Sequence, residues 1–303
     1  MKLFYKVIVL FYSKTYNNLM SIKIYLPNSK YGALLPKEDS SQSSERVFAV
    51  ADGVTRDPKL PKTFKGKRIE DILKYYPRPS GAYTVARIFS KNFIKFSGQT
   101  KNIKTIFDKI NRLIEEYNNK KIKLVDFLEN DYFGCVACGG FIKNNSLFYG
   151  CLGDCGITIL DAKGKIKFQT ENGMEQFINY ENKFLKKKDF NWFMSSYRRF
   201  IRSGYRNTEK FHKNKLISYG VLTGEKKALK FLQYGEKKLN TGDVVIFYSD
   251  GFYPFIKSEI FSKLIQTHSK DKLQHSIIST SLKFARDDYE QFGHERSLII
   301  KFF

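Results

Sequence analysis

The chain has 303 residues, of which 42% are hydrophobic and 16% aromatic, and it contains only seven prolines. This composition excludes a mostly disordered protein, because a chain of this length and apolar content buries roughly three quarters of its unfolded surface on folding. The formal charge of +23 is compatible with an anionic partner, but lysines spread over the whole solvated surface would produce the same charge without one.

The N-terminal region, residues 1–19, carries three lysines and an apolar run from Val7 to Tyr12. This run is too short to span a bilayer, and no small-residue cleavage site follows it. After Met20, the alternating segment Ser21 to Leu26 predicts a strand. We therefore expect an extension or edge strand over residues 1–19, one domain over residues 20–303, and a cytoplasmic protein that does not insert into a membrane.

One strand and two helices are predicted in the next hundred residues. The run Arg46 to Ala51 is apolar and predicts a buried strand that delivers Asp52 at its end. Ser80 is a suitable cap for a helix over Gly81 to Phe96. From Ile103 to Tyr117, apolar residues recur at three- and four-residue intervals, which predicts an amphipathic helix of about four turns.

A predicted hairpin carries most of the cysteines. Its strands are Phe133 to Ile142 and Leu147 to Leu152, joined by a turn over residues 143–146. The cysteines, spaced C-x-x-C and C-x-x-x-C, are Cys135, Cys138, Cys151 and Cys155. This spacing resembles a structural zinc site, but side chains alternate along a strand, so Cys135 and Cys138 would point to opposite faces. We expect small buried thiols, with zinc as the alternative.

Three later strands are predicted, rich in β-branched and aromatic residues. They cover Gly156 to Leu160, Asp243 to Tyr248 and Arg296 to Phe303. A chain of strands, two long helices and then more strands is typical of an α+β domain in which helices stack on antiparallel sheets.

The composition changes between residues 161 and 219, where Phe184 to Lys215 mixes many cations with aromatic residues. A shared helical face would contain Phe193, Tyr197, Phe200 and Ile201, and would leave Arg198, Arg199 and Arg202 on the surface. The simplest interpretation is an amphipathic helix whose aromatic stripe joins the core. A basic, flap-like segment beside a functional site is the alternative, and a nucleic-acid surface is a further one that we do not expect.

Acidic motifs next to short apolar stretches are spread over almost the whole chain. They are Glu38-Asp39, Asp52-Gly53, Gly153-Asp154 and Ser249-Asp250-Gly251. A folded sheet can bring such carboxylates to one point, where they repel one another unless a positive charge lies between them. Because hard divalent cations prefer oxygen ligands, the pattern predicts a site for a pair of them.

The order of these motifs resembles that of the metal-dependent protein phosphatases, the PPM or type 2C serine/threonine phosphatase family. The resemblance covers about residues 30 to 303. The segments that carry it are PKEDS (Pro36 to Ser40), VFAVADGVT (Val47 to Thr55), GCVACGG (Gly134 to Gly140), CLGDCG (Cys151 to Gly156), TGDVVIFYSDGF (Thr241 to Phe252) and GHERSLII (Gly293 to Ile300).

The resemblance implies a fold, an activity and a cofactor. The fold is α+β, with two antiparallel β-sheets in a sandwich flanked by helices on both sides. The implied activity is hydrolysis of phosphoserine and phosphothreonine esters in a phosphoprotein substrate, by a water activated between two Mn²⁺ or Mg²⁺ ions. The alternative is a catalytically weak or inactive relative that binds phosphoproteins as a regulatory module.

The resemblance also implies a ligand set. Asp52 would bridge the two ions and Asp250 would bind one of them, so these two aspartates would be the catalytic pair. The other implied ligands are the Gly53 carbonyl, Glu38 and Asp39 through waters, and Asp154 at a weaker third ion.

The chain departs from the family pattern at two positions that affect function. In the last motif, His294 and Glu295 replace the usual Asp and its neighbour, and either side chain could complete the coordination around the Asp250 ion. The arginine that many members place before the first motif is Leu34 here. Phosphate binding would then fall to Arg56 or Lys37.

Overall fold

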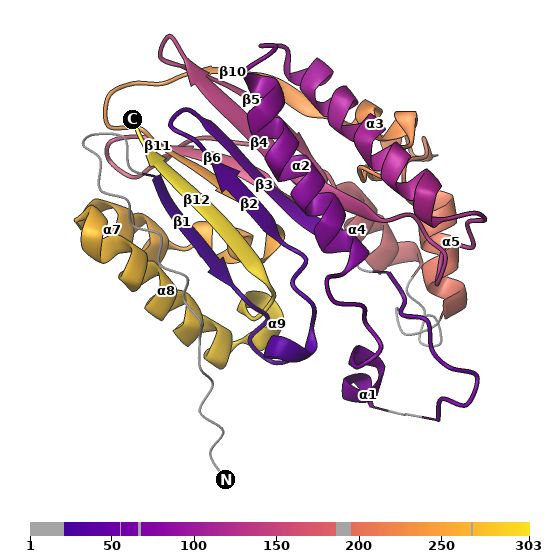
Figure 1. Ribbon diagram of the computed structural model, residues 1–303. Helices are drawn as coiled ribbons and strands as arrows, with labels where there is room; N and C mark the ends of the chain where they lie inside the picture. The colour runs from indigo at the N-terminus through magenta and orange to yellow at the C-terminus, as the bar shows by residue number, and fades with distance from the viewer. Residues whose placement is uncertain (1–20, 55, 66–67, 186–194, 268) are drawn as a thin grey trace.

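The computed structural model describes residues 21–303 except residues 55, 66–67, 186–194 and 268, and its centre is a pair of five-stranded sheets (Figure 1). The first sheet has the order β1 (Ser21–Leu26), β12 (Arg296–Phe302), β11 (Val244–Tyr248), β6 (Gly156–Leu160) and β7 (Ile166–Gln169). The second has the order β10 (Gln233–Lys238), β5 (Ser146–Leu152), β4 (Gly134–Lys143), β3 (Val47–Val54) and β2 (Ser40–Ser43). All neighbouring strands in both sheets are antiparallel.

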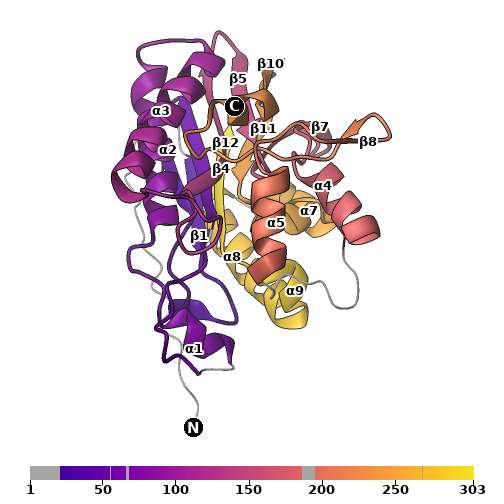
Figure 2. The ribbon, with the colours of Figure 1, turned by 90° about the vertical axis from the view of Figure 1, so that its right-hand side faces the viewer.

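Helices cover the outer faces of both sheets, which confirms the predicted sandwich. On the second sheet lie α2 (Gly81–Ser97) and α3 (Ile103–Lys121), and on the first lie α7 (Glu259–Thr267) and α8 (Lys270–Asp287) (Figures 1 and 2). The shorter helices are α1 (Ile69–Leu73), α4 (Glu175–Tyr180), α5 (Ser195–Tyr205), α6 (Tyr253–Ile256) and α9 (Tyr289–Phe292). A small hairpin, β8 (Phe211–His212) with β9 (Lys215–Leu216), follows α5.

The apolar core forms three layers. One lies between the two sheets and includes Phe48 and Phe247, whose rings stack with centroids 5.3 Å apart. A second lies between β3, β4 and the helices α2 and α3, and a third lies between the first sheet and α6 to α8. The helix α2 begins as predicted, because the Ser80 hydroxyl accepts a hydrogen bond from the Tyr83 backbone N–H.

One predicted boundary is wrong in a way that affects the site. The strand β3 does not end at Asp52 but continues through Asp52 and Gly53 to Val54, and Asp52 pairs with Val136 of β4. The extension arises because β4 starts at Gly134 and offers the ladder partners for these residues. Asp52 is therefore held by strand pairing on a rigid element.

The four cysteines are free, buried thiols, as expected. Cys135 packs under α2 and α3, whereas Cys138 faces the layer between the sheets, so the two side chains do lie on opposite faces of β4. Cys138 pairs directly with Cys151 across β4 and β5. Among the described residues, no group of three or more His, Cys, Asp and Glu side chains is arranged for zinc.

Within the basic, aromatic segment, α5 carries the predicted stripe, and only part of that stripe joins the core. Tyr197 and Ile201 are buried in the core cluster, Phe200 is 40% exposed, contrary to the prediction, and Phe193 lies outside the described residues. The prediction that Arg198 and Arg202 lie on the surface is wrong. Both pair with Asp57, at 2.9 and 3.3 Å, and the side chain of Arg202 is only 6% exposed.

The predicted extension or edge strand over residues 1–19 lies outside the described residues. Within the described ranges, no helix is both long and apolar enough to cross a membrane.

Candidate active site

Strand pairing brings the predicted acidic residues together at one edge of the sandwich. Ser40 pairs with Ala51, which places Asp39 beside Asp52. Gly156, which starts β6, pairs with Tyr248, which ends β11. Asp154, in the link from β5 to β6, and Asp250, just after β11, therefore lie at the same edge. The carboxyl groups of Asp52 and Asp250 lie close enough to change each other's pKa, although 198 positions separate them in the sequence.

Burial raises the pKa of each aspartate in this cluster, and neighbouring acidic charges raise those of Asp52 and Asp154 further. Burial raises the pKa of Asp52, and the nearby charges of Asp39, Asp250 and Asp154 raise it further. Burial, with the charge of Asp250, also raises the pKa of Asp154 to about 7. The buried cluster therefore stabilises protons, or any other cation that takes their place.

Asp154 has an unsatisfied oxygen. Its Oδ1 atom is buried and accepts no hydrogen bond from the described residues. The preceding Gly153 has φ of +82°, and a Cβ atom there would lie 2.2 Å from the Val136 side chain, so only glycine suits the turn that presents Asp154. A buried carboxylate oxygen without a donor is costly unless a cation binds it.

Asp39 is fixed by a hydroxyl from the Ser-Asp-Gly motif. The Ser249 hydroxyl donates to Asp39 Oδ2 at 2.8 Å and accepts the Ser297 backbone N–H at 2.8 Å. This one serine therefore connects the first motif, the Ser-Asp-Gly turn and the last strand. Asp39 itself is 1% exposed, and burial is the main cause of its raised pKa.

The Glu295 carboxylate accepts hydrogen bonds from other groups of the protein and is not left free to bind a metal ion. Its carboxylate accepts the backbone N–H groups of Glu38 and Asp39 at 3.1 Å, and it is also hydrogen-bonded to the Tyr25 hydroxyl. These bonds lower the pKa of Glu295 against the effect of burial, which raises it. Glu295 thus positions the Glu38-Asp39 backbone.

His294 is exposed and lies beside the Asp250 turn. Its charge lowers the pKa of Asp250, and a Cβ atom on Gly251 would lie 2.5 Å from the Glu295 carbonyl, so the two turns are in contact. His294 Nε2 lies 3.0 Å from the Glu290 carbonyl oxygen. Because a carbonyl only accepts, Nε2 donates, and Nδ1 of the neutral ring carries the free lone pair.

Gly53 lies where β3 meets the start of α2. Its N–H donates to the Glu38 carbonyl at 3.2 Å, and a Cβ atom there would lie 2.6 Å from the Ala82 carbonyl carbon. Only glycine permits this close approach, which sets β3, the first motif and α2 at a fixed spacing.

The donor set fits hard divalent cations. Among the residues that the structure describes, no three His, Cys, Asp or Glu side chains are arranged to bind one metal ion directly. Mg²⁺ and Mn²⁺ sites do not require one, because such ions use one or two carboxylates, carbonyl oxygens and several waters. The Asp52–Asp250 contact, the unsatisfied Asp154 oxygen and the raised pKa values are the features that such a cation would relieve.

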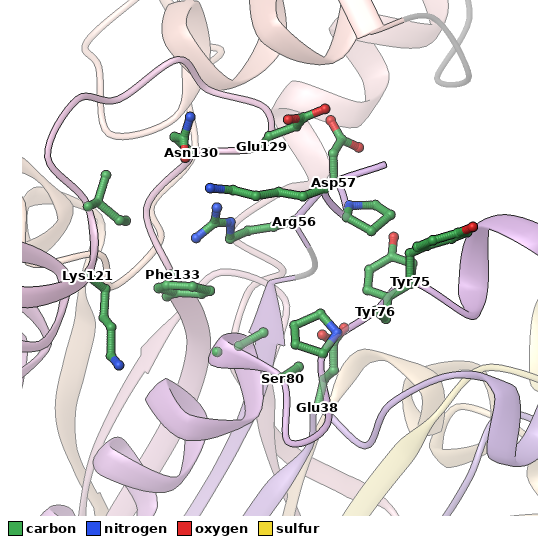
Figure 3. Close-up of a pocket in the computed structure, with 16 residues that line it drawn as sticks. Glu38, Arg56, Asp57, Tyr75, Tyr76, Ser80, Lys121, Glu129, Asn130 and Phe133 are labelled. Carbon is green, nitrogen blue, oxygen red and sulfur yellow. The ribbon is translucent and has the colours of Figure 1, made fainter. Parts of the chain in front are cut away.

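The two predicted phosphate-binding residues lie in different places. The Lys37 ammonium group lies 3.9 Å from the centre of the Tyr25 ring, and the charges of Glu295 and Asp39 act on it. Arg56 instead lines a cavity of about 330 Å³ that also borders Glu38 (Figure 3).

Several residues that build the site carry no recognisable signal in the sequence. Ser249, Tyr25 and the backbone-binding role of Glu295 depend on contacts across more than 200 positions. The sequence also gives no sign that Asp57 and Asp131 form ion pairs with arginines of α5 and the residue after it, although Asp57 closely follows the Asp52-Gly53 motif.

No protein-family model matches this chain, and no curated protein matches it. Solved structures do resemble it. The serine/threonine phosphatase PstP/Ppp of Mycobacterium tuberculosis is 12% identical, with a TM-score of 0.57 over 93% of this chain and 97% of that one. The catalytic domain of PstP in complex with two manganese ions is 13% identical, with a TM-score of 0.54 over 93% and 96%. The photosystem II phosphatase PBCP is 13% identical, with a TM-score of 0.54 over 94% and 99%. The chain therefore has the PPM phosphatase fold.

Proposed function

We propose that this protein is a metal-dependent protein serine/threonine phosphatase of the PPM family. The observation that carries the proposal is the meeting of Asp52 and Asp250, with Asp39 and Asp154 beside them, in a PPM fold. The solved PstP complex with two manganese ions supports the same cofactor for this chain.

In this proposal the acidic residues bind two divalent cations. Asp52 would be a ligand of both, Asp250 of one, and the Gly53 carbonyl of the other. Glu38 and Asp39 orient water around the cations, and Asp154 serves a weaker third ion. When bound, the cations supply an activated water and neutralise charge on the phosphoryl group during in-line displacement. The products are the free seryl or threonyl hydroxyl and inorganic phosphate.

The structure supports His294, rather than Glu295, as the remaining metal ligand. Glu295 already accepts two backbone N–H groups. His294 has its Nε2–H directed to a backbone carbonyl, which is the arrangement that metal-binding histidines usually show. An imidazole ligand suits Mn²⁺ better than Mg²⁺, which prefers oxygen, so we propose Mn²⁺ as the working ion.

Lys37 is the proposed cation for the phosphate of the substrate. It lies among the acids that would hold the metal ions, and burial lowers its pKa while Glu295 and Asp39 act in the opposite direction. Lys37 would bind as a point charge and replace the arginine that is absent at Leu34.

The test is hydrolysis by purified protein with Mn²⁺. We expect turnover of p-nitrophenyl phosphate and of phosphoserine and phosphothreonine peptides, complete loss with a chelator, and recovery when Mn²⁺ is added back. Asp250→Asn should lose activity by several orders of magnitude. Activity that persists after exhaustive chelation contradicts the mechanism.

The changed last motif and Leu34 motivate a second candidate, a phosphoprotein-binding module without turnover. It predicts phosphopeptide binding by calorimetry and no hydrolysis with any divalent ion.

The burial of Arg202 and Arg206 against Asp57 and Asp131 supports a packing role for α5, and a nucleic-acid surface there is not proposed.

A further inference from the structure

A cavity of about 330 Å³ opens beside the acidic cluster, and Glu38 contributes to its lining (Figure 3). Its walls come from the segment after β3, from the chain before α2, and from residues 121–133 between α3 and β4. The Tyr75 and Tyr76 rings line one side, and Phe133 lies across from them. The cavity is large enough for a side chain of a bound peptide.

Arg56 projects into this cavity without a partner of opposite charge. Its guanidinium group lies 4.1 Å from the centre of the Phe133 ring, and Figure 3 shows it above that ring. Among the described residues, no group forms a hydrogen bond or ion pair with it; burial lowers its pKa, and the more distant charges of Asp131 and Asp126 act in the opposite direction. A half-buried guanidinium with all its donors free is a binding site for an oxyanion.

The N-terminus of α2 faces the same cavity. Ser80, Gly81 and Ala82 line it, and the Ser80 hydroxyl caps only the Tyr83 N–H. The N–H groups of Gly81 and Ala82 bond to no described acceptor. A 17-residue helix presents the positive end of its dipole there, and that end favours an anion.

The acids that line the cavity do not neutralise Arg56. Asp57 is engaged by Arg198 at 2.9 Å and by Arg202 at 3.3 Å. Glu129 is exposed to solvent, and Glu38 belongs to the proposed metal site. Lys59, also exposed, adds a second positive charge to the wall.

We infer that this cavity binds an anionic side chain of the substrate that lies close in sequence to the phosphorylated residue. The anion is a carboxylate or a second phosphate, held by the Arg56 guanidinium and the first N–H groups of α2. This inference rests on the proposed function and names its substrate class: phosphopeptides with an acidic or phosphorylated neighbour.

The test uses matched phosphoserine peptides with Mn²⁺. Each of the four positions on either side of the phosphoserine carries alanine, glutamate or a second phosphoserine in turn. We expect one position at which glutamate or phosphoserine raises kcat/KM about tenfold over alanine, as a charge-assisted hydrogen bond would. The ratio between glutamate and phosphoserine separates the two anions.

Arg56→Ala should reduce this preference to about one, and Arg56→Lys should keep part of it, because lysine retains the charge but not the planar fork. Lys91→Ala is the matched control, since Lys91 is exposed on α2, the helix whose N-terminus faces the cavity, and its loss removes the same single positive charge away from the cavity. A preference that survives Arg56→Ala, or the absence of any preferred position, overturns the inference.

A failure of the proposed phosphatase function can be distinguished from a failure of the inference about the cavity. The aryl ester p-nitrophenyl phosphate has no neighbouring residue, so its turnover reports the acidic cluster alone. If neither it nor any peptide is hydrolysed, the peptides are compared by fluorescence anisotropy for binding to the wild-type protein. A tighter complex with the acidic peptide that is lost in Arg56→Ala supports the cavity, and equal affinities contradict it.

Discussion

This protein contains two clusters of buried or partly buried acidic residues, and their negative charges are balanced in different ways. In one, Asp57 and Asp131 are neutralised by arginines, and Arg206 binds Asp131 with both of its terminal nitrogens at 2.7 and 2.8 Å. In the other, Asp52 and Asp250 lie beside each other; burial raises the pKa of both, and the nearby acidic charges raise that of Asp52 further. In the first cluster the charges are balanced within the chain, whereas the second is the site that we propose for divalent cations.

The largest difference between the clusters should appear in catalysis. Asp52→Asn removes the proposed bridging carboxylate, so we expect turnover of p-nitrophenyl phosphate to fall by at least about a thousandfold. The amide keeps the size of the side chain, so circular dichroism should show an intact fold. Near-wild-type turnover in a folded Asp52→Asn protein would contradict the assignment of a catalytic role to the Asp52 cluster alone.

Stability should respond in the reverse way. Asp131→Ala leaves the buried Arg206 without its partner, which should reduce the free energy of unfolding by about 3–5 kcal/mol in urea denaturation. Asp52→Asn in metal-free protein should leave it unchanged or raise it, because one repelling charge is lost. As a surface control, Glu209→Ala breaks the exposed ion pair with Lys230 and should change the free energy of unfolding by about 0.5 kcal/mol or less.

The acidic cluster also predicts a pH dependence. The pKa of Asp154 is about 7 in the folded protein against about 3.9 in an unfolded chain, so the folded state binds the proton more tightly. The stability that this group contributes is therefore fully present below about pH 4 and lost as pH rises toward 7.

Metal-free protein should accordingly melt at a higher temperature at pH 5 than at pH 8, and Asp154→Asn should reduce the difference. At pH 8, Mn²⁺ at about 100 times its dissociation constant should stabilise the fold by about 2.7 kcal/mol. No thermal shift with Mn²⁺ at pH 8 would argue that the cluster needs no cation.

The smallest expected effect concerns the choice of ion. His294→Asp replaces an imidazole with a carboxylate, so the preference for Mn²⁺ over Mg²⁺ in calorimetry should fall by about tenfold. Pulsed electron paramagnetic resonance of bound Mn²⁺ should show coupling to a ¹⁴N nucleus in the wild type and lose it in the variant. An unchanged nitrogen signal would mean that His294 is not a ligand.

The resemblance carried by the ordered motifs implies the sandwich, and the acidic motifs beside short apolar runs predict the meeting of Asp52 with Asp250; the structure has both. The strands β2 and β10 were not predicted, since SSQS and QYGEKK contain almost no apolar residues and take their structure from the neighbouring strands. The helices between residues 253 and 292 were also missed.

The parts of the site that escaped prediction depend on long-range polar contacts. Arg202 looked like a surface residue because its partner Asp57 lies 145 positions away. Glu295 looked like a metal ligand, yet it binds backbone N–H groups 256 and 257 positions away, and backbone donors leave no signature in a sequence.

A titration of metal-free protein with Mn²⁺, followed by electron paramagnetic resonance of the free ion, tests the central claim most directly. The account predicts two bound Mn²⁺ ions per wild-type chain, and loss of tight binding in Asp52→Asn and Asp250→Asn but not in Asp131→Asn. If the wild type binds no Mn²⁺, or if the two active-site variants bind it as the wild type does, the acidic cluster is not a metal centre.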